Sequence, residues 1–268
     1  MQHRPSPTAA KLAVAALAIA MLAGCASAAP AQEAPEETTT NEVSVSTAPE
    51  APAEPETIEP LALNADGLLG GNATVTDFDA GEPGEVSMVS VGTLNPDSGT
   101  LPFVFRNNTA EAVSHVDATA TIRDSAGALV ANGSSQGTTP GQILPGGLGL
   151  AYLYIEEGEV PEGAEIEINF ATSPADQSPF NTANLRVAEW SETEDGFIGT
   201  AANETGVALS GPFSVQVYCF DETGALTTTT GGYANEQEVD ADGSASFSHS
   251  FYGDACSSYY VGVTGWFN

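Results

Sequence analysis

The stretch VDATATIRDSAGAL, residues 116–129, decides the fold. Its first seven residues alternate apolar and polar side chains, which is typical of a half-buried antiparallel strand. Asp124 then caps a tight turn, Gly127 supplies the positive φ that the turn requires, and Leu129 restarts a strand. The same pattern, FSVQVYCFDETGAL, occupies residues 213–226. Two copies of one strand–turn–strand unit indicate an all-β protein.

The duplication extends beyond these two hairpins. Each copy carries an Asn-x-Thr turn, an Asp-x-x-Gly turn and a late glycine turn before a strand; they lie at 107, 124 and 146 in the first copy and at 203, 221 and 243 in the second. The successive intervals are 17 and 22 residues in the first copy, and 18 and 22 in the second. No stretch after residue 66 sustains a helical apolar spacing. The sequence therefore predicts two tandem β-sandwich domains, residues 66–180 and 181–268.

This arrangement resembles the FxLYD family of small extracytoplasmic domains, in which an N-x-T/S turn, a V-x-V-x-A-x-x-x-D-x-x-G hairpin and a late P-G turn recur. The match is carried by Asp124-x-x-Gly127 and Asp221-x-x-Gly224, with Leu144-Pro145-Gly146 as the late turn of the first copy. The second copy departs from the pattern, with Ala241-Asp242-Gly243 there. The resemblance covers roughly residues 89–170 and 185–268. It implies an immunoglobulin-like fold at the cell envelope and offers no catalytic residues.

The N-terminus has the features of an export signal. Arg4 and Lys11 precede the apolar run Leu12 to Ala23, which is shorter than the roughly 20 residues of a membrane span. The run ends in Leu22-Ala23-Gly24-Cys25, which resembles the lipobox of bacterial lipoproteins. The resemblance implies cleavage of residues 1–24 and a lipid on Cys25 that anchors the chain to a membrane. An ordinary signal with a chance cysteine is the alternative.

Residues 25–65 are predicted to form a disordered linker. They are rich in Ala, Glu, Pro and Thr, and residues 26–60 contain no aromatic side chain. A flexible coil of 35 residues spans roughly 30–35 Å, and proline stiffness and charge repulsion extend it further. The linker would hold a folded body away from the membrane surface.

The chain is strongly acidic, with 36 Asp and Glu against five Lys and Arg, two of which lie in the signal segment. Such a chain would repel phosphate backbones and anionic head groups, so the composition argues against binding of nucleic acids or of anionic membrane surfaces through charge. The expected partners are the membrane, through the lipid on Cys25, and a cationic or neutral envelope protein or polymer. The oligomeric state is left open.

Cys219 and Cys256 are predicted to form a disulfide, because both lie in the second copy of an exported chain. Closing a loop of about 37 residues should stabilise the second domain by roughly 3–4 kcal/mol. The expectation is that the first domain is unaffected. Two buried free thiols are the alternative.

The other candidate catalytic and metal sites in the sequence are better explained as structural residues. Gly133-Ser134-Ser135-Gln136-Gly137 matches the G-x-S-x-G of a nucleophile elbow, but no helix follows it. His115 and His249 lack partners at metal-ligand spacing. The acidic clusters do not complete a calcium loop, so we expect no cofactor and no metal; they lie at residues 77–79, 192–195 and 240–243.

The sequence thus favours a non-enzymatic lipoprotein at the extracytoplasmic face of the cell membrane, presenting two β-sandwich domains for binding or structural roles. An envelope hydrolase using a Ser/His site is one alternative. A solute-binding lipoprotein of a transporter is the other, although it would need alternating β and α units around a cleft.

Overall fold

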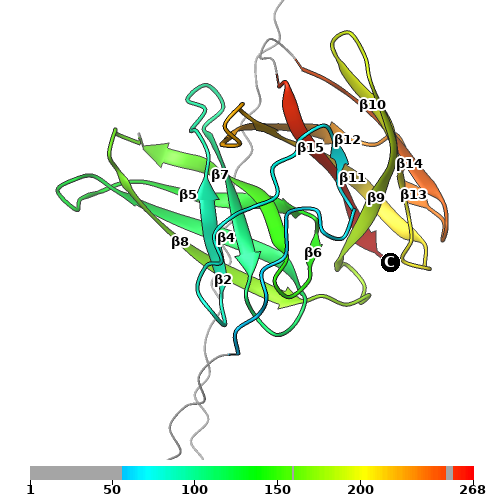
Figure 1. Ribbon diagram of the computed structural model, residues 1–268, viewed down its shortest axis with the longest axis horizontal. Coiled ribbons are helices and arrows are strands. Elements are labelled where there is room, and N and C mark those ends of the chain that lie inside the picture. The colour runs from blue at the N-terminus through cyan, green and yellow to red at the C-terminus, as the bar shows by residue number, and fades with distance from the viewer. Residues whose placement is uncertain (1–55, 159, 252–255) are drawn as a thin grey trace, which may run out of the picture. The chain divides into compact units, whose positions relative to one another are not determined.

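The computed structural model describes residues 56–158, 160–251 and 256–268. In these residues all regular structure is β, as the sequence predicts, and the strands form two antiparallel sheets (Figure 1). Each sheet folds over its own core to give a sandwich-like body, one for each copy of the repeat. The predicted signal segment, Cys25 and the linker as far as residue 55 lie outside the described residues.

The first sheet has seven strands and belongs to the first copy. They are β2 (Val86–Val91), β3 (Thr100–Asn107), β4 (Val113–Arg123), β5 (Leu129–Thr139), β6 (Gln142–Ile143), β7 (Leu148–Gly158) and β8 (Glu165–Pro174). They are hydrogen-bonded in the order β2-β3-β7-β5-β4-β8, and β6 adds to one end of β4.

The second sheet has eight strands, seven of them from the second copy. These are β9 (Thr182–Glu192), β10 (Gly196–Ala202), β11 (Leu209–Phe220), β12 (Leu226–Tyr233), β13 (Glu238–Val239), β14 (Ser244–Ser250) and β15 (Ser258–Phe267). The order is β12-β11-β15-β9-β10-β14, with β13 beside β11. The eighth strand, β1 (Gly70–Gly71), comes from the segment before the first copy and pairs with β15.

Segment 56–84 belongs to the folded body, which corrects two predicted boundaries. Leu63 is only 2% exposed, so the body begins before residue 66. Pairing of β1 with β15 places part of the predicted first domain on the second sheet. Sequence reasoning missed this packing because Leu61 and Leu63 are isolated apolar residues beside an acidic, proline-rich run, with no strand-like alternation around them.

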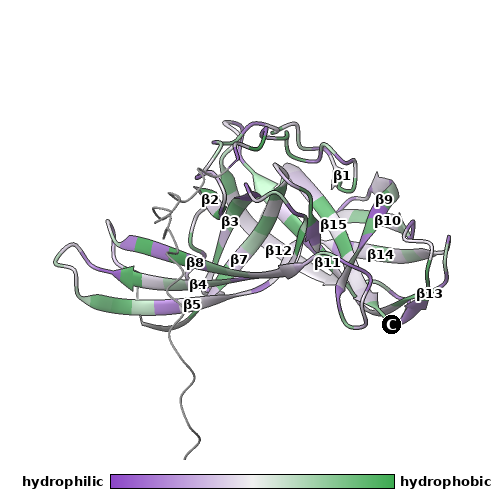
Figure 2. Ribbon diagram, turned by 90° about the horizontal axis from the view of Figure 1, so that it is seen from below, coloured by the Kyte–Doolittle hydropathy of each residue, from purple (hydrophilic) through white to green (hydrophobic). Residues whose placement is uncertain are grey.

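Three apolar clusters hold the body together, and alternating bands along the strands in Figure 2 reflect their two-residue period. One fills the first copy around Phe103, Phe105 and Leu153. Another fills the second copy around Phe213, Val217 and Phe247. The third joins the copies through outward-facing side chains of both sheets and two leucines of segment 56–84; its buried members are Leu63, Leu69, Val104, Leu148, Leu150, Tyr218, Phe220, Leu226 and Tyr260.

Candidate ligand cleft between the two copies

The shared cluster continues into an open cleft because of the strand period. On β7, Ala151 and Leu153 point into the first core, so Leu150 and Tyr152 face the other way. On β11, Val215 and Val217 point into the second core, so Gln216 and Tyr218 also face outward. Leu150 and Tyr218 meet in the shared cluster. The next residues on the same faces, Tyr152 on β7 and Gln216 on β11, line the cleft.

The cleft has a volume of about 280 Å³, near the lower end of small-ligand sites. Strands β3 and β7 and the turn before β3 form the wall from the first copy, and strands β11 and β12 form the wall from the second. Nine residues line it: Ser98, Thr100, Tyr152, Gln216, Thr229, Thr230, Gly231, Gly232 and Tyr233. Two are aromatic, five carry a hydroxyl or amide on an aliphatic side chain, two are glycine, and none is charged.

A buried hydrogen bond joins the two copies beside the cleft, two residues along β7 and β11 from the lining residues Tyr152 and Gln216. The Tyr218 hydroxyl donates to the carbonyl oxygen of Leu150 at 3.1 Å, which links the two copies directly. Burial raises the pKa of Tyr218, so its hydroxyl stays protonated and able to donate. Burial also raises the pKa of Tyr152, and the nearby Tyr233 adds to the shift. Tyr218 and Tyr152 are therefore neutral near pH 7.

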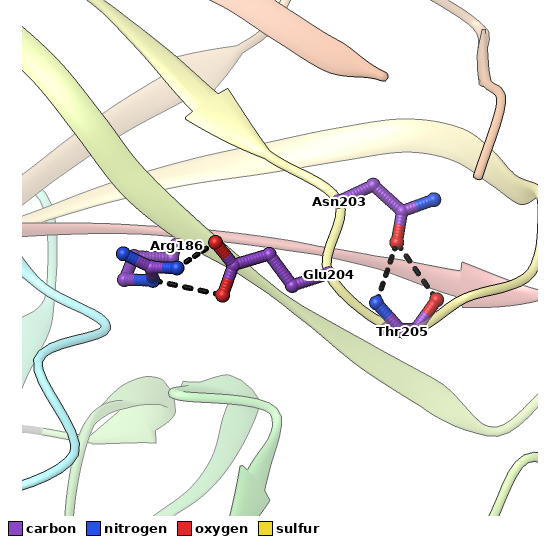
Figure 3. Close-up of polar contacts among 4 residues, drawn as sticks. All are labelled: Arg186, Asn203, Glu204 and Thr205. Carbon is purple, nitrogen blue, oxygen red and sulfur yellow. Dashed lines mark hydrogen bonds and ion pairs between the residues drawn. The ribbon is translucent and has the colours of Figure 1, made fainter. Parts of the chain in front are cut away.

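Away from the cleft, the two copies share a buried asparagine turn. In the second copy, the Asn203 side-chain oxygen accepts hydrogen bonds from the backbone N–H and the hydroxyl of Thr205 (Figure 3). The Asn203 amide donates to the Val207 and Asp240 carbonyls. Next to it Arg186 pairs with Glu204. Asn107 and Thr109 make the matching bonds in the first copy. Both asparagines are essentially buried, which explains why the repeat keeps them.

The predicted disulfide between Cys219 and Cys256 is present, with the two Cα atoms 5.4 Å apart. Cys219 lies on β11 with its side chain in the core of the second copy, and Cys256 precedes β15. The bridge therefore ties the start of β15 to the strand beside it. It lies on the opposite face of β11 from Gln216, so it supports the cleft wall without lining it.

Ser135 and His249, the residues that a Ser/His hydrolase site would need, are not brought together. Ser135 lies on β5 of the first copy, where its hydroxyl accepts the backbone N–H of Ala118 at 2.8 Å. His249 lies on β14 of the second copy, between the rings of Phe197 and Phe251. Burial lowers the pKa of His249. His115 lies in a bulge of β4 and packs against the Trp266 ring, with the ring centroids 5.7 Å apart and the planes tilted by 34°.

The acidic clusters do not form a metal centre in the described part of the chain, where no three His, Cys, Asp or Glu side chains are placed to hold an ion. Glu192, Glu194 and Asp195 line an open hollow beside Cys256. Within it, Asn72 donates to Glu192 at 3.0 Å and accepts from the backbone of Tyr259. Asn72 thus fastens segment 56–84 to the second copy.

Sequence reasoning missed the cleft, although one signal pointed to it. Tyr152, Gln216 and Tyr233 lie at strand positions that alternation assigns to solvent, where this acidic chain would otherwise place charged residues. The cleft forms only where the two copies face each other, so the sequence of either copy alone does not predict it.

Comparisons with known proteins do not name the chain's family. No known protein family matches it, and no curated protein is similar to it. The FxLYD resemblance therefore stays a prediction. In the part of the chain that the structure describes, no helix is long and apolar enough to cross a membrane.

Proposed function

We propose that this chain is a non-enzymatic lipoprotein of the cell envelope, anchored by lipid on Cys25, whose duplicated body binds a ligand in the cleft between the copies. The cleft is the observation that carries the proposal. It lies at the junction of two packed units, where binding sites are commonly found, and all its lining residues except Ser98 stand on strands. The immunoglobulin-like character of the two copies and their extracytoplasmic exposure are part of this proposal.

The charge of the chain supports a partner that is not anionic. After residue 24 only Arg106, Arg123 and Arg186 are basic, against 36 acidic residues. Arg106 and Arg123 donate to backbone carbonyls and Arg186 pairs with Glu204. A nucleic acid or an anionic polymer would find little to bind, so a neutral or cationic envelope polymer or protein is the fitting class.

Replacement of Cys25 tests the anchor. The acidic body has no other affinity for lipid, so Cys25→Ala should move the protein from the membrane fraction to the soluble fraction or leave it unprocessed. The double variant Cys219→Ala, Cys256→Ala keeps Cys25 and should stay with the membrane. Acylation and membrane retention of the Cys25→Ala protein would exclude this anchor.

The absence of turnover can be measured on the same protein. Ester, peptide and glycoside substrates should be left intact by the full chain. Reproducible hydrolysis that Ser135→Ala or His249→Ala abolishes would make the protein an envelope hydrolase.

A further inference from the structure

The cleft differs in its charge from four other hollows of the body. The hollows beside Asp66, Glu189, Asp176 and Glu192 each include at least one carboxylate. The cleft includes none, although acidic residues outnumber basic ones about sevenfold in the whole chain. A cation would find no counter-charge in the cleft, so its occupant should be uncharged.

The lining offers two kinds of contact. Ser98 and Thr100 come from one wall, with their hydroxyl oxygens 2.7 Å apart, and Gln216 and Thr229 come from the other. These groups both donate and accept hydrogen bonds. Tyr152 and Tyr233 add aromatic rings with hydroxyl tips, and Tyr233 is 68% exposed. A saturated ring with an apolar C–H face and a rim of hydroxyls would use both kinds of contact.

A proline-rich peptide is the rival occupant, because tyrosines also line grooves that bind polyproline helices. Such a peptide presents apolar rings and carbonyl acceptors, and it has few donors. The cleft offers no purely hydrocarbon side chain for proline rings. Several of its donors are already bonded within the protein, because Ser98 and Thr100 bond to each other, Gln216 donates to Ser214 and Thr229 donates to the Val217 carbonyl. Their remaining acceptor oxygens would find few donors on such a peptide. Hydroxyl-rich ligands satisfy these groups better.

We propose that the cleft binds an uncharged glycan, with Tyr233 and Tyr152 against the sugar rings and Gln216 and the Ser/Thr hydroxyls on their hydroxyl groups. This rests on the proposed function, since it names the ligand of the same site. The two walls come from different copies, so one glycan segment would contact both.

The test uses the full chain, purified in a detergent without a sugar head group. Its binding is measured on an array of uncharged oligosaccharides and in native gels containing hydroxyethylcellulose, dextran or α-mannan. Sialylated and sulfated oligosaccharides and a polyproline peptide are measured beside them. We expect binding to at least one uncharged glycan and to neither of the other classes.

Variants locate the binding site. Tyr233→Ala and Gln216→Ala should each weaken glycan binding at least tenfold. The matched control is Phe180→Ala, an 82% exposed aromatic residue in the loop between β8 and β9, which should bind within twofold of the parent. Thermal melts show that each variant is folded, and an unfolded variant is replaced by Tyr233→Leu or Gln216→Glu.

The outcomes separate this inference from the proposed function. No glycan binding, binding that survives both cleft variants, or binding of the polyproline peptide instead overturns the glycan inference alone. Release of new reducing ends from a bound glycan would overturn the non-enzymatic function.

Discussion

Arg106 is the residue on which the N-terminal part of the body depends. The residue is 1% exposed, and its guanidinium donates to four backbone carbonyls, those of Leu61, Phe78, Asp79 and Gly146, at 2.7–3.1 Å. Three of the carbonyls belong to segment 56–84, and the fourth belongs to the late turn of the first copy. A planar group with five N–H donors suits this arrangement, and a lysine ammonium could not reach all four.

Replacing Arg106 should therefore lower the stability of the fold. Arg106→Met removes a donor from four carbonyls, of which that of Gly146 keeps the Leu61 backbone N–H. We expect it to lower the free energy of unfolding by at least about 3 kcal/mol, as measured by urea titration. Arg106→Lys should fall between Met and the parent. The control is Arg123→Met, an exposed arginine with one bond to Gly127, which should change stability by less than about 0.5 kcal/mol. A loss below 1 kcal/mol for Arg106→Met would show that water replaces the guanidinium.

At the level of strands, the two copies share their pairings but open at different places. Five pairings of the first copy recur in the second; β2·β3, β3·β7, β4·β5, β4·β6 and β4·β8 correspond to β9·β10, β10·β14, β11·β12, β11·β13 and β11·β15. The first copy adds β5·β7, whereas the second adds β9·β15. The strands therefore follow one another in the same circular order in both copies. The copies differ only in the seam, the pair of neighbouring strands that is not hydrogen-bonded: β2 and β8 in the first copy, β12 and β14 in the second.

The sequence could predict the shared part of this architecture and not the seam. Alternation and turn residues are local, so segments such as 116–122 and the turns at Asp124 and Asp221 were readable. The turns form as expected: the Asp124 carboxylate accepts from the backbone of Ala126 and Ala128, and Asp221 does the same at Thr223 and Ala225. The closing pair depends on contacts between strands far apart in the chain, for which no local pattern exists.

The matched asparagine turns can be tested as a pair. Asn107→Ala and Asn203→Ala each remove a buried amide that satisfies several backbone groups, so each should lower the free energy of unfolding by about 2–4 kcal/mol. Asn132→Ala is the control, since Asn132 heads a similar triplet but lies exposed on β5. Chemical denaturation should give similar free energies of unfolding for the two turn variants, both well below that of Asn132→Ala. A near-neutral effect at one turn would mean that the two copies do not depend on the turn equally.

On the scale of the whole molecule, the outer faces of the two copies share a core. Tyr218 is fully buried against Leu150, and Leu226 and Tyr260 complete the cluster from the second copy. From the sequence, Leu148 and Leu150 look like solvent-facing positions of a single sandwich. Their burial follows from the presence of the other copy, which is why two independent domains were the natural expectation.

The shared core changes what the disulfide should do. The bridge lies in the second copy, so an isolated domain would confine its roughly 3–4 kcal/mol to residues 181–268. Because Tyr218 and Phe220 flank Cys219 on the same strand and pack against the first copy, loosening β11 should also expose Leu148 and Leu150. We therefore expect a reducing agent to lower one common melting transition, with hydrogen exchange rising in β7 as well as in β11 and β15. The double variant Cys219→Ala, Cys256→Ala should melt at the lowered temperature and ignore the reducing agent. Two separate transitions, of which only the second shifts, would instead show that each copy unfolds by itself and that the shared cluster contributes little to stability.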